Sequence, residues 1–165
     1  MDPRIEQAVA ELDDVHAEVV EFVEGCDERE WRELTTVEGW PVGVVAHHIA
    51  VGHVKVIGWL DHLRRGEPVP GNGASHDEGN AQHAAEFRST TKRQTLDDLE
   101  TNAARLREYL QGISSEEMPR EAEHGPAGGV VISVGRMVGA TARHPRAHLA
   151  NMREVVDRDA AERAS

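Results

Sequence analysis

Apolar side chains recur every three or four residues over four stretches of this 165-residue chain, which is the spacing of amphipathic helices. The first stretch follows Asp2, which can cap a helix, and Pro3, which is favoured in the first turn of a helix. This helix is expected to end at Gly25. The second is expected to run from about Pro41 to Arg65. Because each stripe must be buried, the four helices are expected to pack against one another.

The middle of the chain predicts a long connection and then a third helical region. Residues 66–79 contain two prolines and four glycines, which favour a mobile crossover loop. The third region is expected to start near Asn80 and to have two parts, the second with a regular apolar stripe from Leu96 to Ile113. The long connection would therefore lie between the second and third helices.

The C-terminal part predicts a loop and a last helix. Residues 118–129 are rich in proline and glycine and are expected to form a loop, and the run 130–132 is the one candidate strand. The last helix is expected from about Ser133. The fold class is then all-α, a four-helix bundle with a long crossover loop, as a single domain over residues 1–160 and with residues 161–165 as a frayed tail.

Composition and charge restrict the partners. Hydrophobic residues make up 39% of the chain, enough for one core, and the net charge of −12 disfavours nucleic acid, whose binding depends on neutralised phosphates. An anionic membrane surface is disfavoured for the same reason. The N-terminus is charged and lacks the apolar core of a signal peptide. The chain contains no run of about 18 apolar residues that would predict a membrane span. The single cysteine, Cys26, is consistent with a reducing compartment. We expect a cytoplasmic protein with no nucleic-acid or membrane partner.

Three of the ten histidines lie on the predicted apolar stripes. His144 and His148 are four residues apart, so a helix turns them to one face, and His48 lies on the stripe of the second helix. A single histidine on such a stripe is usually a hydrogen-bonded core residue, and that interpretation is favoured for His48 taken alone. Three imidazoles with an open fourth position would instead be the ligand set of a catalytic metal site.

Three segments, in order, resemble the DinB-like superfamily. The first is Gly-Trp-Pro-Val-Gly-Val-Val-Ala-His-His-Ile-Ala at residues 39–50, which resembles the family's Gly-Trp…His-Leu segment. The second is Asp-Glu-Gly-Asn-Ala at residues 77–81, which is similar to the start of the family's third helix. His144 and His148 match its C-terminal His-x-x-x-His pair. The resemblance covers most of the chain and implies an up-down-down-up four-helix bundle.

The resemblance also implies a metal centre. The metal histidine of the family follows the tryptophan at the distance from Trp40 to His48, so His48 is favoured over His47. With His144 and His148 it would bind a divalent metal, zinc or nickel, although three imidazoles also suit copper and iron. Three further residues are candidates for the pocket or for support behind the ligands: His47, Asn80 and Thr141.

Family members with known activity use a low-molecular-weight thiol such as mycothiol or bacillithiol. The resemblance therefore implies a metal-dependent thiol transferase that acts on a small electrophilic substrate in stress protection, and no side chain is assigned as catalytic. A metal-dependent hydrolase of a small amide or ester and a binding bundle without catalysis remain alternatives. A homodimer is also expected, as in many members. The maleylpyruvate isomerases of the family carry a C-terminal domain that this chain is expected to lack.

Pro145 lies between the two C-terminal histidines. Inside a helix a proline removes one backbone hydrogen bond, here to the carbonyl of Thr141, and kinks the helix at a cost of about 3 kcal/mol. A kink or a π-bulge at this position would change the aim of His148 relative to His144, and either the site tolerates such a change or it uses the altered geometry.

Overall fold

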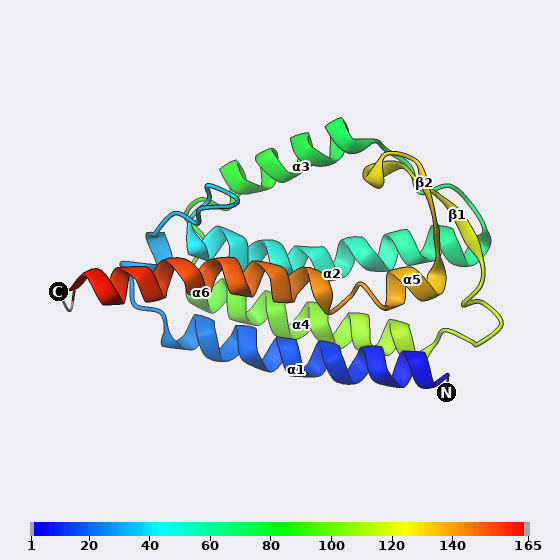
Figure 1. Ribbon diagram of the computed structural model, residues 1–165, viewed down its shortest axis with the longest axis horizontal. Helices are drawn as coiled ribbons and strands as arrows, with labels where there is room; N and C mark the ends of the chain where they lie inside the picture. Colours follow the sequence, from blue (N-terminus) through cyan, green and yellow to red (C-terminus); the bar gives the residue numbers. More distant parts are fainter. Residues whose placement is uncertain (1, 164–165) are drawn as a thin grey trace.

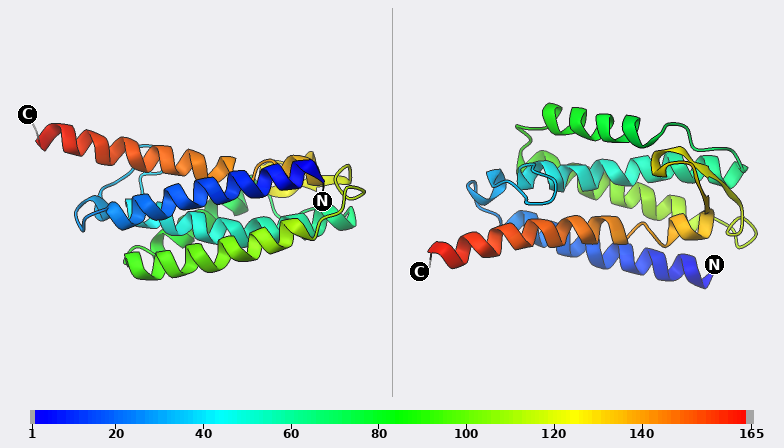
Figure 2. Two further views of the ribbon diagram at one scale, coloured as in Figure 1. Left: turned by 90° about the horizontal axis from the view of Figure 1, so that it is seen from below. Right: turned by 45° about the horizontal axis from the view of Figure 1, so that its top comes forward.

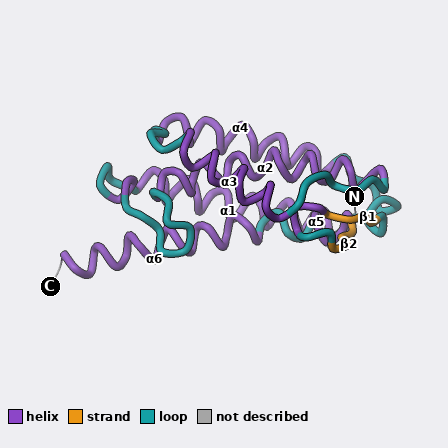
Figure 3. Tube along the Cα trace, turned by 90° about the horizontal axis from the view of Figure 1, so that it is seen from above, coloured by secondary structure: helices purple, strands orange, loops and turns teal. Residues whose placement is uncertain are grey.

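Four long helices lie side by side in the computed structural model, which describes residues 2–163. They are α1 (Pro3–Gly25), α2 (Val42–Arg65), α4 (Lys92–Gln111) and α6 (Arg143–Arg163). In Figure 1, α1 and α6 run in one direction and α2 and α4 in the other, with α2 packed against α4 and α6. The predicted all-α, up-down-down-up four-helix bundle is confirmed. In Figure 3 the loops gather toward the two ends of the bundle.

The ends of α1 and α2 form as the sequence predicts. The side chain of Asp2 accepts a hydrogen bond from the backbone N–H of Arg4, and Pro3 takes the first helical position. Gly66 ends α2 in the left-handed conformation at φ 68°, which glycine adopts without a steric penalty. Between α1 and α2 lies the short 3₁₀-helix η1 (Glu30–Arg32).

Two clusters of buried apolar side chains fill the bundle. One includes Trp31, Ile49 and Leu149, and the other includes Leu12 and Leu106. Helix α2 is long and apolar enough to cross a membrane by length and composition alone, and 56% of its most apolar window is buried. Its position between α4 and α6 is that of a core helix of the bundle.

The connection between α2 and α4 is long, as predicted, but it contains a helix. Helix α3 (Gly73–Glu86) begins at Asn72, which forms a reciprocal capping box with Ser75. The prediction of a loop over residues 66–79 is therefore wrong from Gly73 onward, because this local cap outweighs the glycines. Figure 2 shows α3 standing apart from the bundle, and of its fourteen residues only His83 is buried.

A short hairpin occupies part of the predicted C-terminal loop. Strands β1 (Glu121–His124) and β2 (Val130–Ser133) pair antiparallel, and the 3₁₀-helix η2 (Gly125–Ala127) lies at the turn between them. The strand expected at residues 130–132 is confirmed. The loop expected over residues 118–129 is wrong at β1, whose polar sequence shows no strand pattern and which is a strand because β2 pairs with it.

The predicted last helix is two helices. Helix α5 (Val134–Val138) starts after the cap Ser133, and the chain turns through residues 139–142 before α6 begins at Arg143. Pro145 is therefore the third residue of α6, where no backbone N–H has an intrahelical partner. The predicted kink at Pro145 is wrong for this reason. Helix α6 continues through residues 161–163, which were expected to fray, and residues 164–165 lie outside the described part of the chain.

Candidate metal centre

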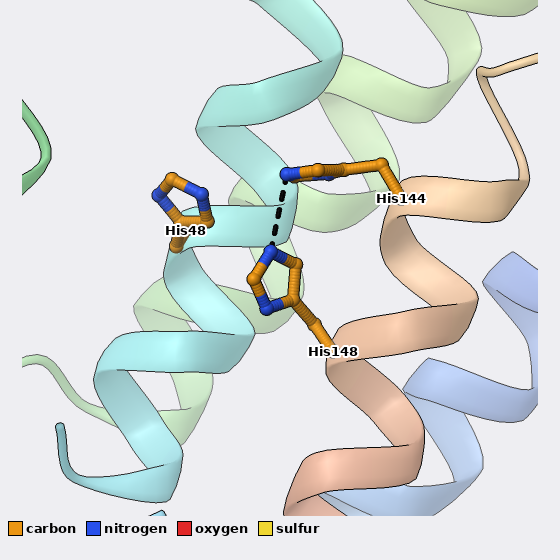
Figure 4. Close-up of side chains that lie close together, drawn as sticks. All are labelled: His48, His144 and His148. Atoms are coloured by element: carbon orange, nitrogen blue, oxygen red, sulfur yellow. Dashed lines mark hydrogen bonds between the residues drawn. The ribbon is translucent and has the colours of Figure 1, made fainter. Parts of the chain in front are cut away.

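His48, His144 and His148 converge between α2 and α6, and we call them the histidine triad. One ring nitrogen from each lies within 4.8 Å of the others. The Nε2 atoms of His144 and His148 are 3.1 Å apart, and the ring of His48 is centred 5.1 Å from that of His148 (Figure 4). Because α6 starts just before His144, both of its histidines come from the first two turns of one regular helix.

The protein environment favours the neutral forms of His48 and His144. Burial lowers the pKa of His48 to about 2, and the neighbouring His148 and His144 add to the effect. The surrounding protein likewise lowers the pKa of His144 to about 4, although this side chain keeps an accessible face on the pocket described below. A neutral imidazole has a free lone pair, so His48 and His144 would be ready to bind a metal at neutral pH.

Glu38 holds His148 in place. Its Oε1 accepts hydrogen bonds from Nδ1 of His148 and from the side-chain amide of Asn151, each at 2.7 Å. Burial alone would raise the pKa of Glu38, but these hydrogen bonds outweigh it and lower the pKa to about 2. The carboxylate is therefore ionised, and it leaves Nε2 of His148 free to face His144. A carboxylate behind a histidine is a common support for a metal ligand.

Glu38→Gln is expected to weaken zinc binding about 10- to 100-fold, because the amide cannot replace the charge that orients and polarises His148. Competition with a chromogenic chelator measures this affinity. Glu154→Gln is the matched control, since Glu154 is an exposed residue of α6 that contacts Thr36 in the same loop as Glu38. Equal zinc affinity for the Glu38 variant and the wild type would show that Glu38 has no such role.

Gly52 gives His144 the room that it needs. It lies one turn after His48 on α2, and a Cβ at this position would come within 3.3 Å of Cε1 of His144. On the other side of His48, the ring of Trp40 packs edge-on at 5.5 Å. A side chain at position 52 would therefore require a small shift of the His144 ring.

A pocket of about 230 Å³ opens beside the triad. His48 and His144 form part of its wall. The remaining lining residues are mostly apolar or small, with one lysine and one further histidine: Gly52, Lys55, Val56, Trp59, His76, Met137 and Ala140. Among residues 2–163, no carboxylate lines this pocket, although the chain has 30 acidic residues.

The sequence profile of the DinB superfamily matches residues 11–152. The chain belongs to the DinB superfamily. It is similar in structure to YfiT from Bacillus subtilis, which is described as a probable metal-dependent hydrolase with an unusual four-helix bundle topology. The TM-score is 0.80 and the sequence identity 18%, and the match covers 97% of this chain and 90% of YfiT. Comparison with curated protein sequences gives no match.

A second DinB-like structure is that of a mycothiol-dependent maleylpyruvate isomerase. The TM-score is 0.73 and the identity 16%, and the match covers 90% of this chain and 60% of the isomerase. At such low identities the two likenesses show a common fold. The chain thus shares its bundle fold with YfiT and with the isomerase, and it spans about 60% of the isomerase's length.

The other predicted site residues of this DinB-superfamily chain lie outside the triad. His47 is buried behind His48, where its Nδ1 is 2.9 Å from Nε2 of His83 and its Nε2 is 3.2 Å from Asp98. The hydroxyl of Thr141 donates to the carbonyl of Val138 within the turn that separates α5 from α6. Asn80 accepts a hydrogen bond from Lys55 at 3.3 Å, next to the pocket.

Sequence reasoning missed four residues around the triad. They are Glu38, in the loop before α2, His76 and His83 on α3, and Lys55 on α2. A signal for the two histidines existed, because His76, Asn80 and His83 share one face of a helix at the spacing i, i+4 and i+7. The fourth, Lys55, has the same spacing from His48 that separates His76 from His83. No local pattern singles out Glu38, whose contact with His148 spans 110 residues.

Proposed function

We propose that the histidine triad binds one divalent metal ion, zinc or nickel. We propose further that the protein is a transferase that adds a low-molecular-weight thiol, of the mycothiol or bacillithiol type, to a small electrophile. The observation that carries this proposal is the convergence of three imidazoles, with His148 held by the ionised Glu38. A homodimer and a cytoplasmic location stay predictions from the sequence.

The donor set fits such an ion. Nδ1 of His48 is buried and has no hydrogen-bond partner, an arrangement that costs free energy unless the ring serves another purpose. The Nε2 atoms of His144 and His148 face each other across 3.1 Å, where at most one of them can carry a proton toward the other. Imidazole suits zinc and nickel equally, so the triad itself does not select between them.

When bound to three imidazoles, a divalent metal keeps an open position and lowers the pKa of a thiol or water placed there. The protein supplies no thiol of its own for this chemistry. Cys26 belongs to one of the two core clusters and does not line the pocket, and burial raises its pKa to about 11. A thiol nucleophile would have to arrive as a cosubstrate.

The pocket favours a thiol over water as the nucleophile. A hydrolase that activates water commonly uses a carboxylate as general base, and in the described part of the chain none faces this pocket. The apolar wall formed by Val56, Trp59 and Met137 excludes water and packs well against an organic substrate. A thiol that is already ionised needs no such base.

Hydrolysis of a small amide or ester is the second candidate. The likeness to YfiT, the probable metal-dependent hydrolase, extends over 97% of this chain and 90% of YfiT. In this case His76, which lines the pocket, is the residue placed to accept a proton. The two candidates differ in whether turnover requires a thiol.

Zinc- or nickel-loaded protein is expected to join mycothiol or bacillithiol to monochlorobimane. The thiol sulfur displaces chloride, and the thiol proton passes to the buffer. Fluorescence of the conjugate measures the rate, which should fall at least about 100-fold in His144→Ala and persist in Cys26→Ser. Turnover of para-nitrophenyl acetate without any thiol, and no conjugate, would favour the hydrolase instead.

A further inference from the structure

Lys55 brings a positive charge to the pocket beside the triad. It lies seven residues after His48 on α2, about two turns along the same face, and it lines the same 230 Å³ pocket as His48 and His144. Its charge also contributes to lowering the pKa of His48, His83 and His144. The ammonium is therefore within electrostatic reach of the triad.

No acidic side chain in residues 2–163 forms an ion pair with Lys55. Its hydrogen bond goes to a neutral group, the side-chain oxygen of Asn80 at 3.3 Å. The side chain is partly buried, and this burial lowers its pKa. A charge withdrawn from water without an opposite charge is costly, and this chain has 30 acidic residues that could have paired with it.

Helix α3 positions Lys55 from outside the bundle. Asn80 accepts from Lys55 through its oxygen, and its amide nitrogen lies 3.2 Å from Nε2 of His76. His76 in turn packs against the ring of Trp59, with ring centroids 5.9 Å apart. These contacts link the lysine to two other residues near the pocket and leave donor capacity on its ammonium, which has three N–H groups.

We propose that Lys55 is the anion-binding residue of this pocket and that the small substrate is a carboxylate with an apolar body. The carboxylate accepts a hydrogen bond from the Lys55 ammonium, and the apolar body packs against Trp59 and Met137. A single ammonium matches a singly charged group better than a phosphate dianion. This inference rests on the proposed function, since it places the reactive atom of the carboxylate substrate beside the triad.

Calorimetry with benzoate and its neutral isostere benzamide tests the inference on metal-free and zinc-loaded protein. Metal-free wild type is expected to bind benzoate at least about tenfold more tightly than benzamide, and added salt should reduce this preference. Lys55→Met should abolish the preference and leave benzamide binding unchanged, whereas Lys55→Arg should retain it. Lys92→Met is the matched control, because the chain's other lysine donates to the carbonyl of Cys26.

Equal preference for benzoate in Lys55→Met and wild type would overturn the inference, as would the absence of any preference in wild type. Thermal unfolding of each variant checks that it folds, and Lys55→Gln replaces the methionine variant if that variant does not. Zinc content is measured in parallel. Failure of wild type to bind zinc would refute the proposed function, while the metal-free measurements would still decide the role of Lys55.

Discussion

Alanine in place of His48 or His148 is expected to abolish stoichiometric zinc binding. Wild type, purified without a histidine tag, should bind one equivalent of zinc or nickel, because its three ring nitrogens lie within 4.8 Å of one another. At a free zinc concentration of about 1,000 times the dissociation constant, binding would stabilise the fold by about 4 kcal/mol. For a chain of this size that corresponds to a melting temperature about 8–16 °C higher. Chelator should remove this increment from wild type and leave both variants unaffected.

His124→Ala is the control for this experiment. His124 is also buried and its Nε2 has no hydrogen-bond partner, but it lies on β1 and outside the triad. It should bind metal as wild type does. Metal retained in both His48→Ala and His148→Ala would refute the choice of ligands. Wild type that stays below one equivalent after incubation with either metal would refute the site.

Gly43→Ala is expected to destabilise the fold by about 3 kcal/mol, the upper part of the range for overpacking a core. A Cβ on Gly43 would lie 2.3 Å from Cε2 of Trp31 and 2.5 Å from its Nε1. Trp31 cannot move freely, because it is buried and its indole N–H donates to the carbonyl of Thr90 at 3.0 Å. Urea or thermal unfolding, followed by circular dichroism, measures the loss of stability.

Gly58→Ala on the same helix is the matched control and should change stability in the opposite direction. A Cβ at Gly58 meets nothing within 4 Å, and alanine in a helix interior is favoured over glycine by about 0.5–1 kcal/mol. If both variants are equally stable, Trp31 is not held as tightly as its packing and hydrogen bond indicate.

The sequence predicts the four helices because they depend on local periodicity, whereas the choice of His48 as the third member of the triad depends on the family resemblance of residues 39–50. The stripes of α1, α2 and α6 must be buried whatever their neighbours are, and His48 lies on the buried stripe of α2. The expectation that His144 and His148 lie on the buried stripe of α6 is wrong, because that stripe runs through Leu149, Met152 and Val155, and His144 is exposed. Glu38 could not be predicted in the same way, since its role comes from contacts with His148 and Asn151 more than 100 residues away. Contacts between residues that are far apart in the chain produce no periodic pattern in the sequence.

The error at Pro145 has a different origin. A proline in a helix interior kinks the helix, but Pro145 would be interior only if one helix continued from Ser133. The structure instead ends α5 at Val138 and begins α6 at Arg143. The turn through residues 139–142, closed by the hydroxyl of Thr141, moves the proline into a first turn. The position of a helix boundary, the least reliable part of a sequence prediction, thus decides whether Pro145 interrupts the backbone hydrogen bonds of the helix or leaves them intact.

The separation of α3 from the bundle allows selectivity and stability to evolve independently. The triad and its supports belong to α2, α6 and the loop before α2, whereas α3 contributes His76 to the pocket wall and Asn80 beside Lys55 while burying little of itself. Substitutions on α3 would therefore remodel the substrate side of the pocket at small cost to folding. A scaffold of this kind can change the lining of its pocket through one peripheral helix while its histidine triad stays unchanged.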